Sequence, residues 1–176
     1  MPRLIKDGKE VDDRWALRRD VDCRADVADG APVIVPLAFW LEYRDALLAR
    51  GDVGVWLAPG DDPAALARDI ETLPVIAVDF PQFTDGRGYS IARLLRDRHG
   101  YAGELRAVGE VLRDQLFALN ECGFDAFALP DGHDAAATLS GFDDFTAVYA
   151  STARTPQPWF RRRESNAGDD PVRATD

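Results

Sequence analysis

The sequence is poor in the residues that build disulfide frameworks and metal sites. Its two cysteines, Cys23 and Cys122, lie far apart, and neither belongs to a CxxC pair or lies near a pair of histidines. The only histidines, His99 and His133, form no HExxH motif and no recognisable Ser/His/Asp order. The chain therefore shows no zinc site and no disulfide framework, and we expect two buried thiols in a reducing compartment.

Positive charge and long apolar runs are also scarce. The chain has 21 Lys and Arg against 31 Asp and Glu, a formal net charge of -10. Such a chain repels nucleic-acid phosphates and anionic lipids. The longest apolar run, residues 36–41, is far too short to cross a bilayer, and the N-terminus lacks the apolar core of an export signal. We therefore expect a cytoplasmic protein that binds neither nucleic acid nor membranes, in which any anion site is a local cluster of arginines.

From residue 32 onward, short β-rich runs alternate with segments whose apolar residues have helical spacing. This alternation predicts an α/β fold of successive βα units, forming either an open, mainly parallel sheet or a partial (β/α) barrel. Periodicity does not separate these two, although a full barrel of eight units would need a longer chain. The predicted strands are 33–35, 53–57, 74–80, 104–108 and 124–129, and the predicted helices are about 36–50, 63–73, 89–99, 110–120 and 134–150.

The two ends of the chain differ from this regular centre. The first 30 residues consist of short extended pieces, with the Asp-Gly signal of a tight hairpin between Lys6 and Lys9, and we expect them at an edge. Residues 161–176 lack apolar periodicity and should be disordered. The sequence thus predicts a single α/β domain over 1–160 and a disordered tail over 161–176.

The densest polar stretch runs from Asp79 to Ser90 and follows the third predicted strand, where parallel sheets bind ligands. Arg87 lies between two glycines just before a helix, so backbone N–H groups and a guanidinium could face one anion. Alternatively, Arg87 pairs with Asp79 or Asp85 and only fixes the loop. The full G-x-G-x-x-G fingerprint is absent. The candidate ligand-binding residues here are Arg87, Gly88, Ser90 and Arg93, and the candidate acids or bases are Asp79 and Asp85.

A second polar feature lies inside the fourth predicted strand. Glu104 and Arg106 alternate with apolar residues and so point to the same face. Burying opposite charges in a covered sheet is costly unless they are hydrogen-bonded, so this face lines a polar cavity or the strand is at an edge. The pair is either functional, with Glu104 as acid or base and Arg106 binding an anion, or a structural ion pair that also meets Asp125.

The segment from Asp79 to Phe127 carries the runs FTDGRGYS, GELRAVG, LRDQL and CGFDAF. It resembles a proteobacterial family of unknown function whose members are sometimes labelled oxidoreductase. Genes of this family commonly lie beside those for sulfite reductase and the reductase of phosphoadenylylsulfate. The resemblance therefore implies a role in assimilatory sulfate reduction, with sulfite reductase as the implied partner, and it carries over no catalytic residue.

Three functions fit these observations. The first is an accessory protein that binds sulfite reductase or an anionic intermediate, since the chain has no iron–sulfur cysteine set, no flavin motif and no identifiable cofactor. The second is a small enzyme acting on a sulfur oxyanion or phosphorylated metabolite. The third is an oligomeric scaffold. In the second, the anion is held by Arg87, Arg93 and Arg106, and the acid or base is Asp79, Asp85 or Glu104.

Overall fold

The computed structural model describes residues 3–21, 23, 26–27, 30–128, 139 and 151–154. In this part of the chain one eight-stranded sheet has the order β2-β1-β8-β7-β6-β5-β4-β3. Strands β3 to β8 are parallel, whereas β1 is antiparallel to both β8 and β2. The strands are β1 (Arg3–Lys6), β2 (Lys9–Asp12), β3 (Ala16–Leu17), β4 (Val33–Pro36), β5 (Val53–Leu57), β6 (Val75–Phe80), β7 (Glu104–Gly109) and β8 (Ala126–Ala128).

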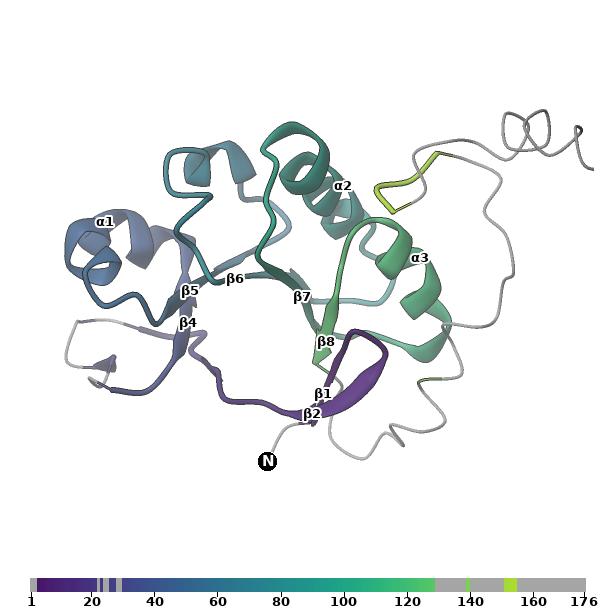
Figure 1. Ribbon diagram of the computed structural model, residues 1–176, viewed down its shortest axis with the longest axis horizontal. Helices are drawn as coiled ribbons and strands as arrows, with labels where there is room; N and C mark the ends of the chain where they lie inside the picture. The colour runs from purple at the N-terminus through teal and green to yellow at the C-terminus, as the bar shows by residue number, and fades with distance from the viewer. Residues whose placement is uncertain are drawn as a thin grey trace, which may run out of the picture.

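The sheet is curled, with the helices on its convex side (Figure 1). Strands β4 to β8 pair in chain order, and successive right-handed crossovers place their helices on the same face. Of the two predicted architectures, the partial barrel is therefore the one observed, and the α/β class is confirmed. The helical segments are α1 (Leu37–Leu48), η2 (Pro63–Leu66), α2 (Arg87–Arg93), η3 (Leu94–Arg98), η4 (Arg113–Gln115) and α3 (Leu116–Glu121).

Strand β6 shows why the centre of the sheet is apolar on both faces. Its residues Ile76, Val78 and Phe80 belong to the large core beneath the helices. Val75 and Ala77 belong to a smaller cluster on the opposite face. Because both faces are covered, the strand is apolar except for Asp79 near its end.

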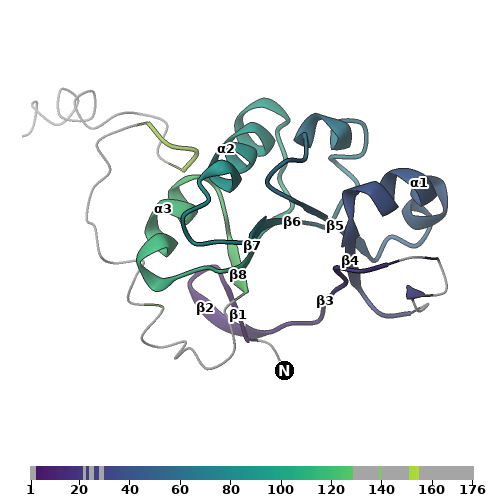
Figure 2. The same cartoon turned by 180° about the vertical axis from the view of Figure 1, so that it is seen from behind.

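The N-terminal residues close the open side of the curled sheet. Asp7 and Gly8 have φ values of 49° and 72°, as a two-residue hairpin turn requires, and Lys6 pairs with Lys9. This hairpin adds β1 to β8, so the predicted turn is confirmed and β2 forms one edge of the sheet. Residues 13–15 then cross to β3, which pairs with β4 at the other edge (Figures 1 and 2).

Some predictions are corrected by the structure. The segment 63–73 is a short 3-10 helix followed by turns, although its apolar residues are buried. Cys23 is exposed rather than buried, whereas burial raises the pKa of the Cys122 thiol. The helix predicted over 134–150, the loop residue His133 and the tail over 161–176 lie outside the described residues.

A buried carboxylate ties α1 to the segment after η2. Arg44 donates Nε to Oδ2 of Asp69 over 2.7 Å and Nη2 to its Oδ1, and Trp40 donates its indole N–H to Oδ2 over 3.3 Å. The hydrogen bonds from Arg44 are the main cause that holds the pKa of Asp69 below its ordinary value. The network therefore stabilises the fold through the ionised form of Asp69.

This network makes the free energy of unfolding depend on pH in the acidic range. Because the pKa of Asp69 is lower in the folded chain, the unfolded chain binds the proton first, and the contribution of Asp69 is lost as pH falls below about 4. In Asp69→Asn the free energy of unfolding should be lower at neutral pH and should change less between about pH 5 and pH 2. Urea unfolding over this range measures both effects. Asp45→Asn is the control, since Asp45 also contacts Arg44 (3.0 Å) but is exposed; an equal change in that variant would contradict the assignment.

Candidate functional site

The inward side of the curled sheet is here called the concave face. It carries polar residues that the alternation of strands and helices in the sequence does not account for. Its apolar part consists of Ile34, Val75, Ala77 and Val108, against which Trp15, Leu17, Trp56 and Ala128 pack. Ionic groups lie at both ends of this cluster. The end at the starts of β6 and β7 is called the amino edge, and the end where these strands finish is called the carboxyl edge.

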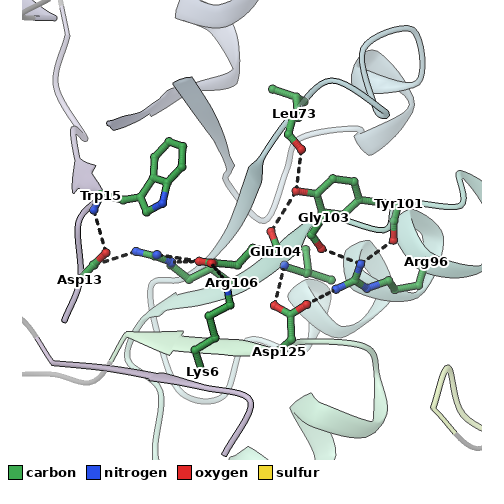
Figure 3. Close-up of polar contacts among 11 residues, drawn as sticks. Lys6, Asp13, Trp15, Leu73, Arg96, Tyr101, Gly103, Glu104, Arg106 and Asp125 are labelled. Atoms are coloured by element: carbon green, nitrogen blue, oxygen red, sulfur yellow. Dashed lines mark hydrogen bonds and ion pairs between the residues drawn. The ribbon is translucent and has the colours of Figure 1, made fainter. Parts of the chain in front are cut away.

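At the amino edge, Arg106 is the centre of a buried ionic network (Figure 3). Its Nε and Nη2 donate to Oε1 of Glu104 over 2.9 and 2.7 Å, and its Nη1 donates to Oδ2 of Asp13 over 2.8 Å. Lys6 donates to the other oxygen of Glu104 over 2.7 Å, which raises the pKa of Lys6. Two cations and two carboxylates are thus paired, and Arg106 is only 1% exposed.

The structure distinguishes between the two locations predicted for Glu104 and Arg106, a polar cavity and an edge of the sheet. Strand β7 lies between β6 and β8, so these charges are inside the sheet and face a lined cavity rather than an edge. The pocket beside them measures about 210 Å³ and is lined mainly by the N-terminal segment, including Lys6, Asp13 and Trp15. Both carboxylates have cationic partners, which is the arrangement that the alternative of a structural ion pair predicts.

Asp125 does not belong to this network. Its carboxylate accepts from Arg96 over 2.8 Å and from the N–H of Leu105 over 2.9 Å, and burial raises its pKa (Figure 3). Arg96 also donates to the carbonyl oxygens of Tyr101, Gly103 and Gly123. Arg96 therefore ties η3 to the loops before β7 and β8. The extra partner of Arg106 is Asp13, not Asp125.

At the carboxyl edge, Asp79 lies on the concave face near the end of β6. Its Oδ1 accepts from Nη2 of Arg19 over 2.6 Å, and the guanidinium carbon of Arg19 lies 5.6 Å from the ring centroid of Trp56. Trp56 in turn donates its indole N–H to the carbonyl oxygen of Arg18 over 3.0 Å. The hydrogen bond that Arg19 donates to Asp79 raises the pKa of Arg19. The segment after β3 is thereby fixed over the ends of β5 and β6.

A pocket of about 340 Å³ lies beside Arg19 at this edge. Residues 19–21, the last residue of β4 and the first turns of α1 line it. Strand ends and the loops after them are where parallel sheets usually bind ligands. The carboxyl edge therefore combines a fixed arginine, a buried carboxylate and an adjoining pocket.

The loop 81–86 belongs to the stretch 79–90, which was predicted either as an anion site with Arg87 or as a loop that Arg87 fixes through Asp79 or Asp85. Arg87 donates Nε and Nη2 to Asp85 over 3.0 and 2.6 Å, and this pairing lowers the pKa of Asp85. Gly88 is buried in α2, where a Cβ would overlap the ring of Phe80, so it serves close packing. Ser90 is exposed on the same helix. The observed contacts match the alternative in which Arg87 fixes the loop through Asp85.

Hydrogen bonds of Gln115 also fix this loop, which exposes an aromatic ring. Gln115 donates its side-chain N–H to the carbonyl oxygen of Phe83 over 2.6 Å, while its Oε1 accepts from the N–H of Leu112. Phe83 is 53% exposed. The loop is therefore a fixed feature of the surface.

The candidate site residues predicted from the sequence do not share one pocket. Arg106 is buried on the concave face, Arg87 starts α2 on the convex side, and Arg93 pairs with Asp97 along that helix at 2.7 Å. Of the candidate acids, Asp79 is the one that contacts a residue lining the pocket at the carboxyl edge, namely Arg19. Sequence reasoning missed Arg19 and Asp13, because both lie in the N-terminal stretch without periodicity. The only signal there was an Arg-Arg pair after a short apolar piece.

Comparisons with known proteins identify a family but no activity. A family model described as "Bacterial protein of unknown function (DUF934)" matches residues 54–160, which is more than half of the chain. No curated protein and no solved structure matches the chain. In the part that the structure describes, no helix has the length and apolarity needed to span a membrane.

Proposed function

This chain belongs to the bacterial family of unknown function DUF934, and on that premise we propose that it is a cytoplasmic accessory protein of assimilatory sulfate and sulfite reduction. Its action is to bind sulfite reductase. The resemblance of residues 79–127 to proteins encoded beside that reductase supports the choice of partner. The geometry of the nominated acids supports binding rather than turnover.

The observation that carries the proposal is that each nominated carboxylate has a cationic partner. Asp79 pairs with Arg19 at 2.6 Å, Asp85 with Arg87 at 2.6 Å, and Glu104 with Arg106 at 2.7 Å. A carboxylate that accepts hydrogen bonds from a fixed guanidinium has fewer oxygen lone pairs left for a proton of a substrate. The ion pairs therefore support a role of these carboxylates in holding segments in place rather than in acid–base chemistry.

The clamped loop 81–86 is the docking surface that fits this function. Gln115 and the Asp85–Arg87 pair fix its backbone, so presenting Phe83 to a partner costs little additional ordering. Aromatic residues are enriched in the centres of protein interfaces, where one ring often carries much of the binding energy. Loop 81–86 also lies at the end of β6, where α/β folds place their binding groups.

The test uses the purified protein and purified sulfite reductase. We expect the two to co-migrate on a sizing column and the turnover of the reductase with sulfite to change when the protein is added. Phe83→Ala should weaken the association about tenfold or more. Leu41→Ala is the matched control, because Leu41 is a similarly exposed apolar residue (48%) but lies on α1. Absence of both co-migration and any effect on turnover would refute the proposal, and equal binding by Phe83→Ala would refute the docking surface.

The alternative of a small enzyme acting on a sulfur oxyanion or phosphorylated metabolite has less support from the geometry. It would draw on Arg87, Arg93 and Arg106 together, and these side chains lie at three separate places with carboxylate partners of their own. Binding of an anionic intermediate by the accessory protein would require a different arginine. Among the described residues, Arg19 is the one that lines a pocket at the carboxyl edge.

A further inference from the structure

The pocket beside Arg19 is built from the carboxyl ends of two parallel strands. Pro36 is the last residue of β4, Phe39 lies in the first turn of α1, and Arg19 follows β3. Its volume of about 340 Å³ is enough for a small metabolite. Nothing in the family match assigns a ligand to this place.

One wall of the pocket offers a fixed cation. Arg19 is oriented by Asp79, whose side chain is largely buried, and by the face of Trp56. A guanidinium carries five N–H donors in a rigid fork, and Asp79 contacts one nitrogen, Nη2. The side chain of Arg19 is 46% exposed, so part of the group reaches solvent. Such an arginine is well suited to bind a carboxylate or another oxyanion.

Negatively charged residues also line this pocket. Asp20 and Glu42 both line it, and Glu42 lies one helical turn after Ala38, another lining residue, on the same side of α1. With one cation and two carboxylates, the rim repels a simple dianion such as sulfate, because the two negative groups oppose it. The same rim favours a ligand that carries an ammonium group together with its anionic group.

The remaining wall is apolar. Val21, Pro36 and Phe39 line the same pocket, and the ring of Phe39 lies 4.7 Å from that of Tyr43 on the same helix at a tilt of 42°. A pocket lined by a cation, by carboxylates and by apolar side chains matches a molecule with two opposite charges and a hydrocarbon substituent. The N-terminal end of α1 adds a weak favourable field for the anionic end, since no side chain caps it.

We propose that this pocket binds a zwitterion of the α-amino acid type. The carboxylate is held by Arg19, the ammonium group faces Glu42 and Asp20, and the side chain lies against Phe39 and Val21. Asp79 and Trp56 are positioning residues that hold Arg19. This inference goes beyond the accessory function, because it gives the protein a small-molecule ligand, and its test does not use the reductase.

The experiment is a thermal-unfolding screen of the full chain with each proteinogenic amino acid at about 10 mM, a concentration at which even a Kd near 1 mM gives a measurable shift. We expect at least one amino acid to raise the melting temperature. For that amino acid, the N-acetyl derivative lacks the cation and the amide lacks the anion, and both should bind at least about tenfold more weakly in calorimetric titrations. If no amino acid shifts the melting temperature, the proposal is overturned.

Variants locate the site. Arg19→Gln should weaken binding of the selected amino acid at least about tenfold, whereas Arg18→Gln, an exposed neighbour outside the pocket, should bind as the unchanged protein does. Glu42→Gln provides an exposed change that leaves the Arg19–Asp79 pair intact, and it should weaken the amino acid but not its N-acetyl derivative. Equal binding of sodium sulfate and the amino acid, or equal binding by Glu42→Gln, would show a plain anion site and refute the zwitterion.

Discussion

Replacing Arg106 with alanine should lower the free energy of unfolding by about 3–5 kcal/mol, the cost of removing one partner from a buried ion network. The change leaves Glu104 and Asp13 inside the sheet without the guanidinium that bonds to both. It also empties the space of a large side chain that is almost fully buried. Residues 13–15 should then be held less firmly on the concave face, because Asp13 loses its guanidinium partner there.

Urea unfolding of the two proteins measures this loss. Arg18→Ala removes an exposed arginine from the same side of the sheet and should change stability by no more than about 0.5 kcal/mol. Combining Arg106→Ala with Glu104→Ala and Asp13→Ala should cost less than the sum of the three single changes, since fewer unpaired charges stay buried. A loss below about 1 kcal/mol for Arg106→Ala alone would contradict a network that stabilises the fold.

Gly109→Ala should destabilise the protein by about 2–5 kcal/mol, from a strained backbone and from overlap with β6. Gly109 is the last residue of β7 and has a φ of 96°, a backbone conformation that residues other than glycine rarely adopt. A Cβ there would overlap the carbonyl oxygen of Phe80 and lie 2.9 Å from Oδ1 of Asp79. The change therefore acts on both the sheet and the carboxylate that orients Arg19.

A second glycine separates the two causes. Gly51 has a φ of 72°, but a Cβ there would meet no atom within 4 Å. Gly51→Ala should therefore cost only the backbone strain, about 1 kcal/mol. Unfolding measurements on both variants give the contact cost as their difference. If both variants lost the same free energy of unfolding, the close approach of Gly109 to Phe80 and Asp79 would not contribute to the loss.

The parallel strands could be predicted because each carries its own pattern. β5 has no charged residue and β6 has only Asp79, and the structure places these strands at 53–57 and 75–80, close to the predicted 53–57 and 74–80. The ends of the segment 63–73 were less predictable. Asp62 accepts from the N–H of Ala64 and Pro63 follows it, which are start signals of a helix, yet the 3-10 helix ends at Leu66 and turns follow.

The candidate site depended on contacts that no local pattern contains. The spacing of Glu104 and Arg106 correctly predicted one shared face, because strands alternate their side chains. It gave no sign of Asp13 or Lys6, which reach this face only through the pairing of β1 with β8. Asp79 was nominated by its place after an apolar strand, but its partner Arg19 comes from a segment whose position is set by two-residue pairing of β3 with β4. Whether these residues bind a ligand is the prediction that the amino acid screen tests.

The pairing of β1 with β8 has a consequence for how the chain is made. On the ribosome, β4 to β7 emerge in the order in which they pair, whereas β1 must wait for residues 126–128 to appear. At ordinary translation rates that delay is on the order of ten seconds. During this time the N-terminal hairpin has no neighbouring strand except its own second half, and its charged residues, Lys9 and Glu10 among them, disfavour premature pairing with other nascent chains. Although β1 precedes the parallel strands in the chain, it is thus among the last of the described strands to dock.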